Sequence, residues 1–134
     1  MKQNLNTLAW STALGATAVI LGALAAHSLK AQISSDSLAA FNTGVRYQMW
    51  HALALLALSF LNSKSIFIKW TKIFWVTGCL LFAISIYLLS TSSLTSMHLG
   101  ILGPITPLGG LLMTAGWVSL FLFAITGKNR KKNY

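Results

Sequence analysis

The sequence has very few charged residues and almost no acidic ones. Charged residues occupy 8% of the 134 positions and Asp36 is the only acidic side chain, whereas hydrophobic residues make up 55% and the mean hydropathy is +0.69. Soluble domains usually carry about a quarter charged residues, so this chain could not cover a surface exposed to water. The composition therefore excludes an ordinary soluble globular protein.

Cysteines and paired metal ligands are also scarce. Cys79 is the only cysteine, which excludes an internal disulfide and a CxxC metal site. The histidines, His27, His51 and His98, form no HxxxH or HExxH pair and have no carboxylate partner. We therefore expect no metal and no cofactor. Scattered hydroxyls and one thiol do not make a nucleophile with its base, so we expect the protein not to be an enzyme.

Long apolar runs without charge are what the sequence has instead. They accommodate four segments near residues 7–28, 45–62, 71–90 and 106–126, each close to the ~20 residues that a helix needs to cross a bilayer. The polar stretch STSSLTSMHLGILGP separates the last two segments. The runs lack the alternation of membrane strands. The sequence thus predicts an all-α membrane protein, a four-transmembrane-helix bundle that forms a single domain over residues 1–134.

The basic residues indicate the orientation of such a bundle. Only Lys30 and Arg46 fall on one side of the membrane, and the other side receives Lys2, Lys64, Lys69, Lys72, Lys128, Arg130, Lys131 and Lys132. The positive-inside rule then places both termini in the cytoplasm. The tryptophans expected near the inner boundary are Trp10, Trp70 and Trp75. Trp117 lies ~15 Å deep in the fourth span, where its indole N–H needs a partner.

The first apolar segment could also be read as a cleaved signal peptide. The stretch GALAAHSL at residues 22–29 contains a possible signal-peptidase site, and cleavage there would leave three spans. The preceding apolar run is, however, longer than the roughly 7–15 residues of the apolar region in a typical signal peptide.

The net charge of +9 could attract nucleic acid, but the basic residues stand at span ends, so we expect no nucleic-acid partner.

Small residues recur at helical spacing in the first and last spans. The first span carries Gly15, Ala18, Gly22 and Ala26, and the fourth carries Thr106, Gly109, Gly110, Thr114 and Gly116. Small residues let helix backbones approach closely in lipid. We expect these two spans to make the tightest helix contact. The alternative is that glycine and alanine are simply common in membrane helices.

The segment between the first two spans predicts a short amphipathic helix. Ser34 or Ser35 can cap it and Asp36 suits its first turn, while Leu38, Phe41 and Val45 share one face. We expect this helix to lie at the outer membrane interface, with Gly44 as a bend or break before the second span.

Polar side chains then gather where the second span begins, and we expect them all near the outer edge of the membrane. This polar cluster consists of His27, Arg46, Tyr47, Gln48, His51, Tyr87 and Thr106. Ionisable groups inside a membrane are functional candidates, here as ligands for a metal, heme or quinone or as a proton relay. The favoured interpretation is structural, with hydrogen bonds that tie neighbouring helices together.

Four sequence segments resemble the YgdD/YwdK-like family of small bacterial inner-membrane proteins, a domain-of-unknown-function family. They are GALAAHSL (22–29), FNTGVRYQMWHALALL (41–56), SIYLL (85–89) and GPITPLGGLLMTAGW (103–117). The resemblance covers nearly the whole chain. It implies a four-span protein of the bacterial inner membrane that retains its first span, and it supplies no reaction or ligand.

These observations lead to three functional hypotheses. We favour a structural component of the membrane that binds lipid, a membrane-protein partner or a second copy of itself. A small transporter or channel subunit is the second hypothesis. Proton-coupled transport would want a carboxylate within the membrane, and the only acidic residue of the chain, Asp36, lies outside the predicted spans. An enzyme ranks last, with heme or quinone binding at the outer histidines as its least unlikely form.

Overall fold

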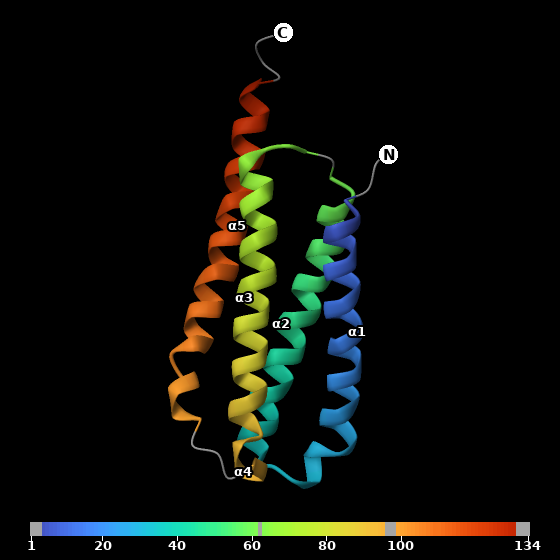
Figure 1. The fold of residues 1–134 in the computed structure, drawn as a ribbon, viewed down its shortest axis with the longest axis vertical. Coiled ribbons are helices and arrows are strands. Elements are labelled where there is room, and N and C mark those ends of the chain that lie inside the picture. The colour runs from blue at the N-terminus through green and yellow to red at the C-terminus, as the bar shows by residue number, and fades with distance from the viewer. Residues whose placement is uncertain (1–3, 62, 96–98, 131–134) are drawn as a thin grey trace.

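The computed structural model describes residues 4–61, 63–95 and 99–130, with side chains as far as Thr126. Every regular element in these ranges is helical, which confirms the all-α class (Figure 1). The elements are α1 (Leu5–His27), η1 (Leu29–Ala31), α2 (Ser35–Ser59), α3 (Ile66–Ser90), α4 (Ser92–Thr95), η2 (Gly100–Leu102) and α5 (Ile105–Arg130).

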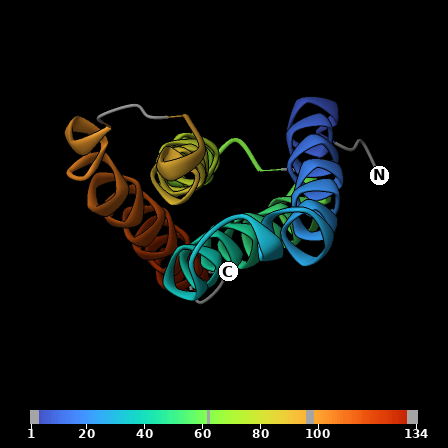
Figure 2. The ribbon, with the colours of Figure 1, turned by 90° about the horizontal axis from the view of Figure 1, so that it is seen from below.

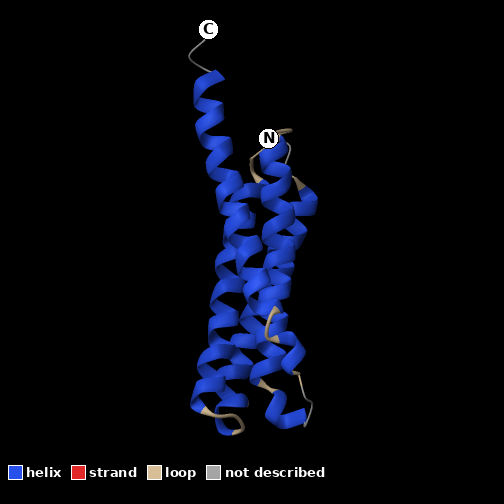
Figure 3. Ribbon diagram, turned by 90° about the vertical axis from the view of Figure 1, so that its left-hand side faces the viewer, coloured by secondary structure: helices blue, strands red, loops and turns tan. Residues whose placement is uncertain are grey.

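The four long helices stand side by side in chain order and alternate in direction. α1 packs along α2, α2 along α3 and α3 along α5, so the start of α1 and the end of α5 lie at the same end (Figure 1). Seen along the helices they form a bent row, with α1 and α5 at its two ends (Figure 2). The predicted tight contact between the first and fourth spans is therefore wrong. The last turns of α5 extend past the other helices (Figure 3).

Three helical segments are long and apolar enough to cross a membrane. They are Leu5–Ala31, Ile66–Ser90 and Gly100–Thr126. The helix α2 is not among them, because its first half carries polar residues such as Asp36, Asn42 and Arg46. The chain thus contains transmembrane helices.

The amphipathic segment is the first half of α2 and not a separate helix. Its cap is as expected, since the Ser34 side chain accepts a hydrogen bond from the Ser37 backbone N–H and Asp36 lies in the first turn. The expected break at Gly44 is absent, and α2 runs unbroken from Ser35 to Ser59. A Cβ on Gly44 would lie 2.8 Å from the Tyr87 ring. This glycine serves a close helix contact, not a bend.

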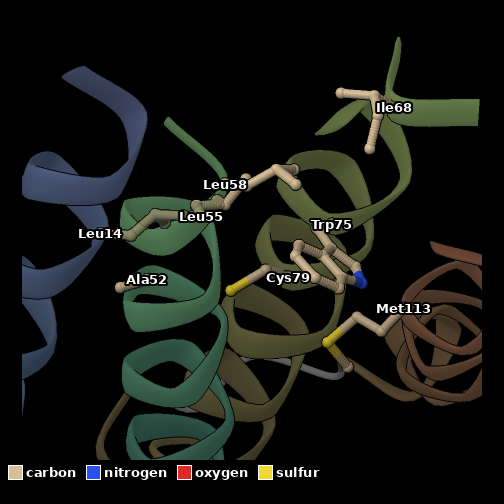
Figure 4. Close-up of a cluster of buried hydrophobic side chains, with 8 residues drawn as sticks. All are labelled: Leu14, Ala52, Leu55, Leu58, Ile68, Trp75, Cys79 and Met113. Carbon is tan, nitrogen blue, oxygen red and sulfur yellow. The ribbon is translucent and has the colours of Figure 1, made fainter. Parts of the chain in front are cut away.

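Buried positions repeat every three or four residues along the long helices. In α2 this series is Phe41, Gly44, Gln48, His51, Leu55 and Leu58. A repeat of about 3.5 residues is typical of helices that pack at a small left-handed crossing angle. The central core cluster takes side chains from all four long helices, among them Leu14, Leu55, Trp75 and Met113 (Figure 4).

Trp75 lies in this core and is 1% exposed. The prediction that it lies at the inner boundary of the membrane is therefore wrong.

The small residues do pack helices, but with other partners than expected. Gly15, Ala18 and Gly22 face α2, whereas Ala26 is exposed. On α5, Gly109 and Gly116 lie against α3, and a Cβ on Gly109 would lie 2.5 Å from the Phe82 nitrogen. Backbone meets backbone here, because Gly78 faces Gly109 from α3. Gly110 points elsewhere, with no atom within 4 Å of its Cβ position.

The adjacent glycines of α5 allow a matched test of this contact. Gly109→Ala forces α3 and α5 apart and should lower the free energy of unfolding by about 1–3 kcal/mol, the usual cost of overpacking. Gly110→Ala should leave stability unchanged or slightly raised, since alanine is the better helix former. Thermal unfolding of both variants in detergent, followed by circular dichroism, measures the difference. Equal melting temperatures would contradict the close contact.

Candidate functional site

The centre of the predicted polar cluster is the amide of Gln48, which joins three helices. Its Nε2 donates to the Leu14 carbonyl oxygen at 2.9 Å and to the Thr17 Oγ1 at 2.7 Å, both on α1. Its Oε1 accepts a hydrogen bond of 2.8 Å from the Tyr87 hydroxyl on α3. Gln48 is 4% exposed. The amide therefore uses its donors and its acceptor within the protein.

The surrounding residues explain why Tyr87 can reach this amide. The ring of Tyr87 packs against Phe41 with 4.6 Å between centroids, and it lies over the bare backbone of Gly44. Phe41, Gly44 and Gln48 occupy successive positions of the buried repeat of α2. Any side chain at Gly44 would displace the tyrosine ring from Gln48.

Further hydroxyl groups also bond neighbouring helices to each other. The Ser11 hydroxyl donates to the Ala52 carbonyl oxygen at 2.9 Å, which links α1 to α2. Ser85 and Thr106 share a hydrogen bond of 2.7 Å between α3 and α5. The Ser119 hydroxyl donates to the Phe67 carbonyl oxygen at 2.9 Å. Each helix of the row is thus bonded to its neighbour through side chains.

His51 is buried nearby but is not part of this network. Its Nδ1 lies 2.9 Å from the Tyr47 carbonyl oxygen, which can only accept, so Nδ1 carries a proton. In a neutral ring Nε2 is then a bare acceptor, and it is buried without a hydrogen-bond partner in the described structure. The rings of Trp75 and Trp117 meet the imidazole edge-on, with centroids at 5.9 Å and 6.3 Å. The Trp75 indole N–H is likewise buried and unpartnered there.

A groove of about 540 Å³ runs beside His51 between α2 and α5. Tyr47, Phe82, Met113 and Trp117 contribute to its walls. The groove is therefore mainly aromatic and apolar, with one imidazole at its side. Among the described residues, no three histidine, cysteine or acidic side chains gather as a metal site would require.

The depth of His51 differs from the prediction. The bond between Ser11 and Ala52 puts His51 level with the second turn of α1, whereas His27 is the last residue of that helix. At 1.5 Å per residue the two histidines lie roughly 24 Å apart along the bundle. The expectation that they share the outer edge is wrong. The reason is that α2 starts ten residues before Val45, which moves the whole polar stretch inward.

The other members of the predicted cluster are dispersed. His27 is exposed at the end of α1. The exposed Arg46 guanidinium donates to the Thr43 hydroxyl at 3.1 Å, back toward the start of α2. Thr106 bonds to Ser85 and not to Gln48. His98 lies outside the described residues. The structure brings together Gln48 with Tyr87, and His51 with Tyr47.

Sequence reasoning missed Thr17 and Trp75 as neighbours of the site. Thr17 is one turn after Leu14, and both accept from Gln48. The usable signal was the spacing of small and polar residues, since Gly44, Gln48 and His51 follow the same repeat as the buried leucines of α2. In lipid, such residues mark the inside of a helix pair.

The apolar helices and the hydrogen bonds between them define an all-helical membrane protein. The chain belongs to the family described as "Protein of unknown function (DUF423)", whose model matches residues 21–110. The resemblance drawn from the sequence is thereby confirmed.

Individual relatives cover most of the chain. It is similar to the UPF0382 membrane protein YwdK of Bacillus subtilis, with 39% identity over 81% of this chain and 86% of the relative. It is also similar to the UPF0382 inner membrane protein YgdD of Escherichia coli, with 34% identity over 84% of this chain and 83% of the relative. No solved structure matches the chain.

The network around Gln48 predicts a specific loss of stability. Gln48→Leu keeps the volume but removes three hydrogen bonds, each worth about 0.6 and at most about 1.7 kcal/mol between membrane helices. We expect a loss of roughly 2 kcal/mol in thermal unfolding in detergent. Tyr87→Phe is the matched control, since it removes only the hydrogen bond to the Oε1 of Gln48 and should therefore lose less stability. A Gln48→Leu variant as stable as the wild type would contradict the structural importance of the amide.

Proposed function

We propose that this protein is a four-span protein of the bacterial inner membrane with both termini in the cytoplasm. We further propose that it acts without catalysis, by binding lipid or a membrane partner along its open sides. The observation that carries this proposal is the use of its buried polar groups. Ser11, Gln48 and Ser119 each bond to a neighbouring helix. Groups used in this way fix helix positions and are not available for chemistry.

The arrangement of α2 supports the count of four spans. α2 is antiparallel to α1 and α3 and packs along both (Figure 1). A helix that packs between two transmembrane helices over its length spans the same depth of the bilayer as they do. Its polar residues Gln48 and His51 are buried against these neighbours, which lowers the cost of placing them in hydrocarbon.

The distribution of charge supports the orientation. Lys64, Lys69 and Lys72 stand where α3 begins, at the end of the row from which α1 also starts (Figure 1). We call this the lysine-rich end. The opposite end, around η1 and the start of α2, carries Lys30 and the only acid, Asp36. The positive-inside rule then turns the lysine-rich end to the cytoplasm.

Single cysteines introduced into the connections test the topology. The native Cys79 is buried and gives little background. We expect Gln32→Cys and Ser93→Cys to react with a membrane-impermeant maleimide in intact spheroplasts, and Ser63→Cys to react only after permeabilisation. If Gln32→Cys and Ser63→Cys reacted from the same side, α2 would not cross the membrane and the four-span proposal would fail.

His51 favours a second candidate function, the binding of a membrane-soluble ligand such as a quinone or heme. The supporting observation is the unpartnered Nε2 beside an aromatic groove. Leaving a buried acceptor unpaired costs about 1–3 kcal/mol, so in a purely structural protein this nitrogen lowers stability.

The variant His51→Phe separates the two candidates. It keeps an aromatic ring between Trp75 and Trp117 and removes the unpaired nitrogen, so we expect its melting temperature in detergent to equal or exceed that of the wild type. Under the ligand-binding alternative, the wild type purified in mild detergent would carry a heme or quinone absorption band that His51→Phe lacks. Such a band would favour the second candidate over the first.

A further inference from the structure

A second groove lies on the other face of the row, between α1 and α3 at the lysine-rich end. Its volume is about 610 Å³. Lys64, Lys69 and Lys72 line its mouth together with Asn4 and Asn6. Its deeper part is lined by Leu55, Ile73 and Val76. One groove thus combines a basic, hydrogen-bonding entrance with an apolar interior.

The lysines at the mouth have no acidic side chain near them to balance their charge. The only acidic side chain, Asp36, is in the first turn of α2 at the opposite end of the bundle. The backbone N–H of Asn4 bonds to the Ser59 carbonyl oxygen, which holds the start of α1 beside the end of α2 and so fixes one wall. Among the residues that the structure describes, the entrance is therefore a positively charged surface without an acidic side chain to balance it.

The length of the groove, with its lysine-lined mouth included, is close to the thickness of one leaflet of a bilayer. On α3 its lining runs from Lys69 to Thr77, and Ser65 before the helix also lines it, so the groove is about 18 Å long at 1.5 Å per residue. Half of a hydrocarbon core is about 15 Å. Trp10 lines the groove near its mouth, at the level where tryptophans sit at membrane interfaces. The part beyond Lys72 extends only about 8 Å further, to Thr77. The groove therefore fits a charged head and the first part of a hydrocarbon tail.

We infer that this groove binds one anionic phospholipid from the leaflet at the lysine-rich end. Its phosphate lies among Lys64, Lys69 and Lys72, where ammonium groups supply both charge and hydrogen bonds. One acyl chain lies over Leu55, Ile73 and Val76. This inference rests on the proposed function, which it deepens by naming the lipid class and its site.

Native mass spectrometry of the full chain in detergent tests the site. Phosphatidylglycerol and phosphatidylcholine with the same acyl chains serve as probes. We expect the wild type to retain one phosphatidylglycerol in preference to phosphatidylcholine. The variant with Lys64→Gln, Lys69→Gln and Lys72→Gln should lose this preference, with affinity for phosphatidylglycerol reduced about ten-fold or more, because each lysine near a phosphate surface contributes about five-fold.

Three matched variants separate the groove from general charge effects. Replacing Lys128, Lys131 and Lys132 by glutamine removes the same charge from the C-terminal run and should leave the retained lipid in place. Replacing the three groove lysines by arginine keeps the charge and should keep binding. Ile73→Trp fills the apolar part and should weaken binding without a change of charge. Circular dichroism of each variant checks that it is folded.

Several outcomes would overturn the inference. They are equal binding of the two lipids, an equal loss from the C-terminal variant, or full binding by the folded triple glutamine variant. Sodium phosphate alone should not raise the melting temperature, and an increase equal to that from phosphatidylglycerol would assign the site to a free anion. Failure of the topology test would instead overturn the proposed function, while lipid retention in detergent is measured independently of it.

Discussion

The structure depends on contacts that hold helices together where apolar burial gains nothing. A leucine is as well solvated by lipid tails as by another helix, so association needs close backbone approach and hydrogen bonds. The amide of Gln48 supplies the hydrogen bonds for α1, α2 and α3. Gly78 and Gly109 supply the close approach of α3 and α5. The apolar cluster around Trp75 then fills the space that these contacts define.

This constraint explains how much of the fold the sequence could predict. Apolar length and end signals located α1, α3 and α5, and Ser34, one of the two predicted caps, caps α2. Gly44 was misread, because a glycine that bends a helix and a glycine that admits a neighbouring ring look the same in one sequence. Only the position of Tyr87 distinguishes them. The partner of each small-residue stripe was also out of reach, since spacing describes one helix face and not what covers it.

The candidate site was predicted in some of its members but not in its position. Gln48 and Tyr87 do meet, yet His27 and Arg46 stay apart from them. A continuous α2 carries His51 to the level of the second turn of α1.

The row of helices is open on both faces, because α1 does not pack along α3 and α5 does not pack along α2. The two grooves lie at these openings, one basic at its mouth and one aromatic.

His51 is the residue at which a structural and a ligand-binding account of this protein diverge. The bond from Nδ1 to the Tyr47 carbonyl oxygen fixes the neutral tautomer, which leaves Nε2 without a donor. The cost of that unpaired acceptor, about 1–3 kcal/mol, is comparable with the whole contribution of three hydrogen bonds between membrane helices. A proton on Nε2 would instead place a charge in a buried site walled by two indole rings, where burial disfavours it. A ligand that donates a hydrogen bond to Nε2 would therefore compensate this nitrogen, and phenylalanine at the same position removes the need for one.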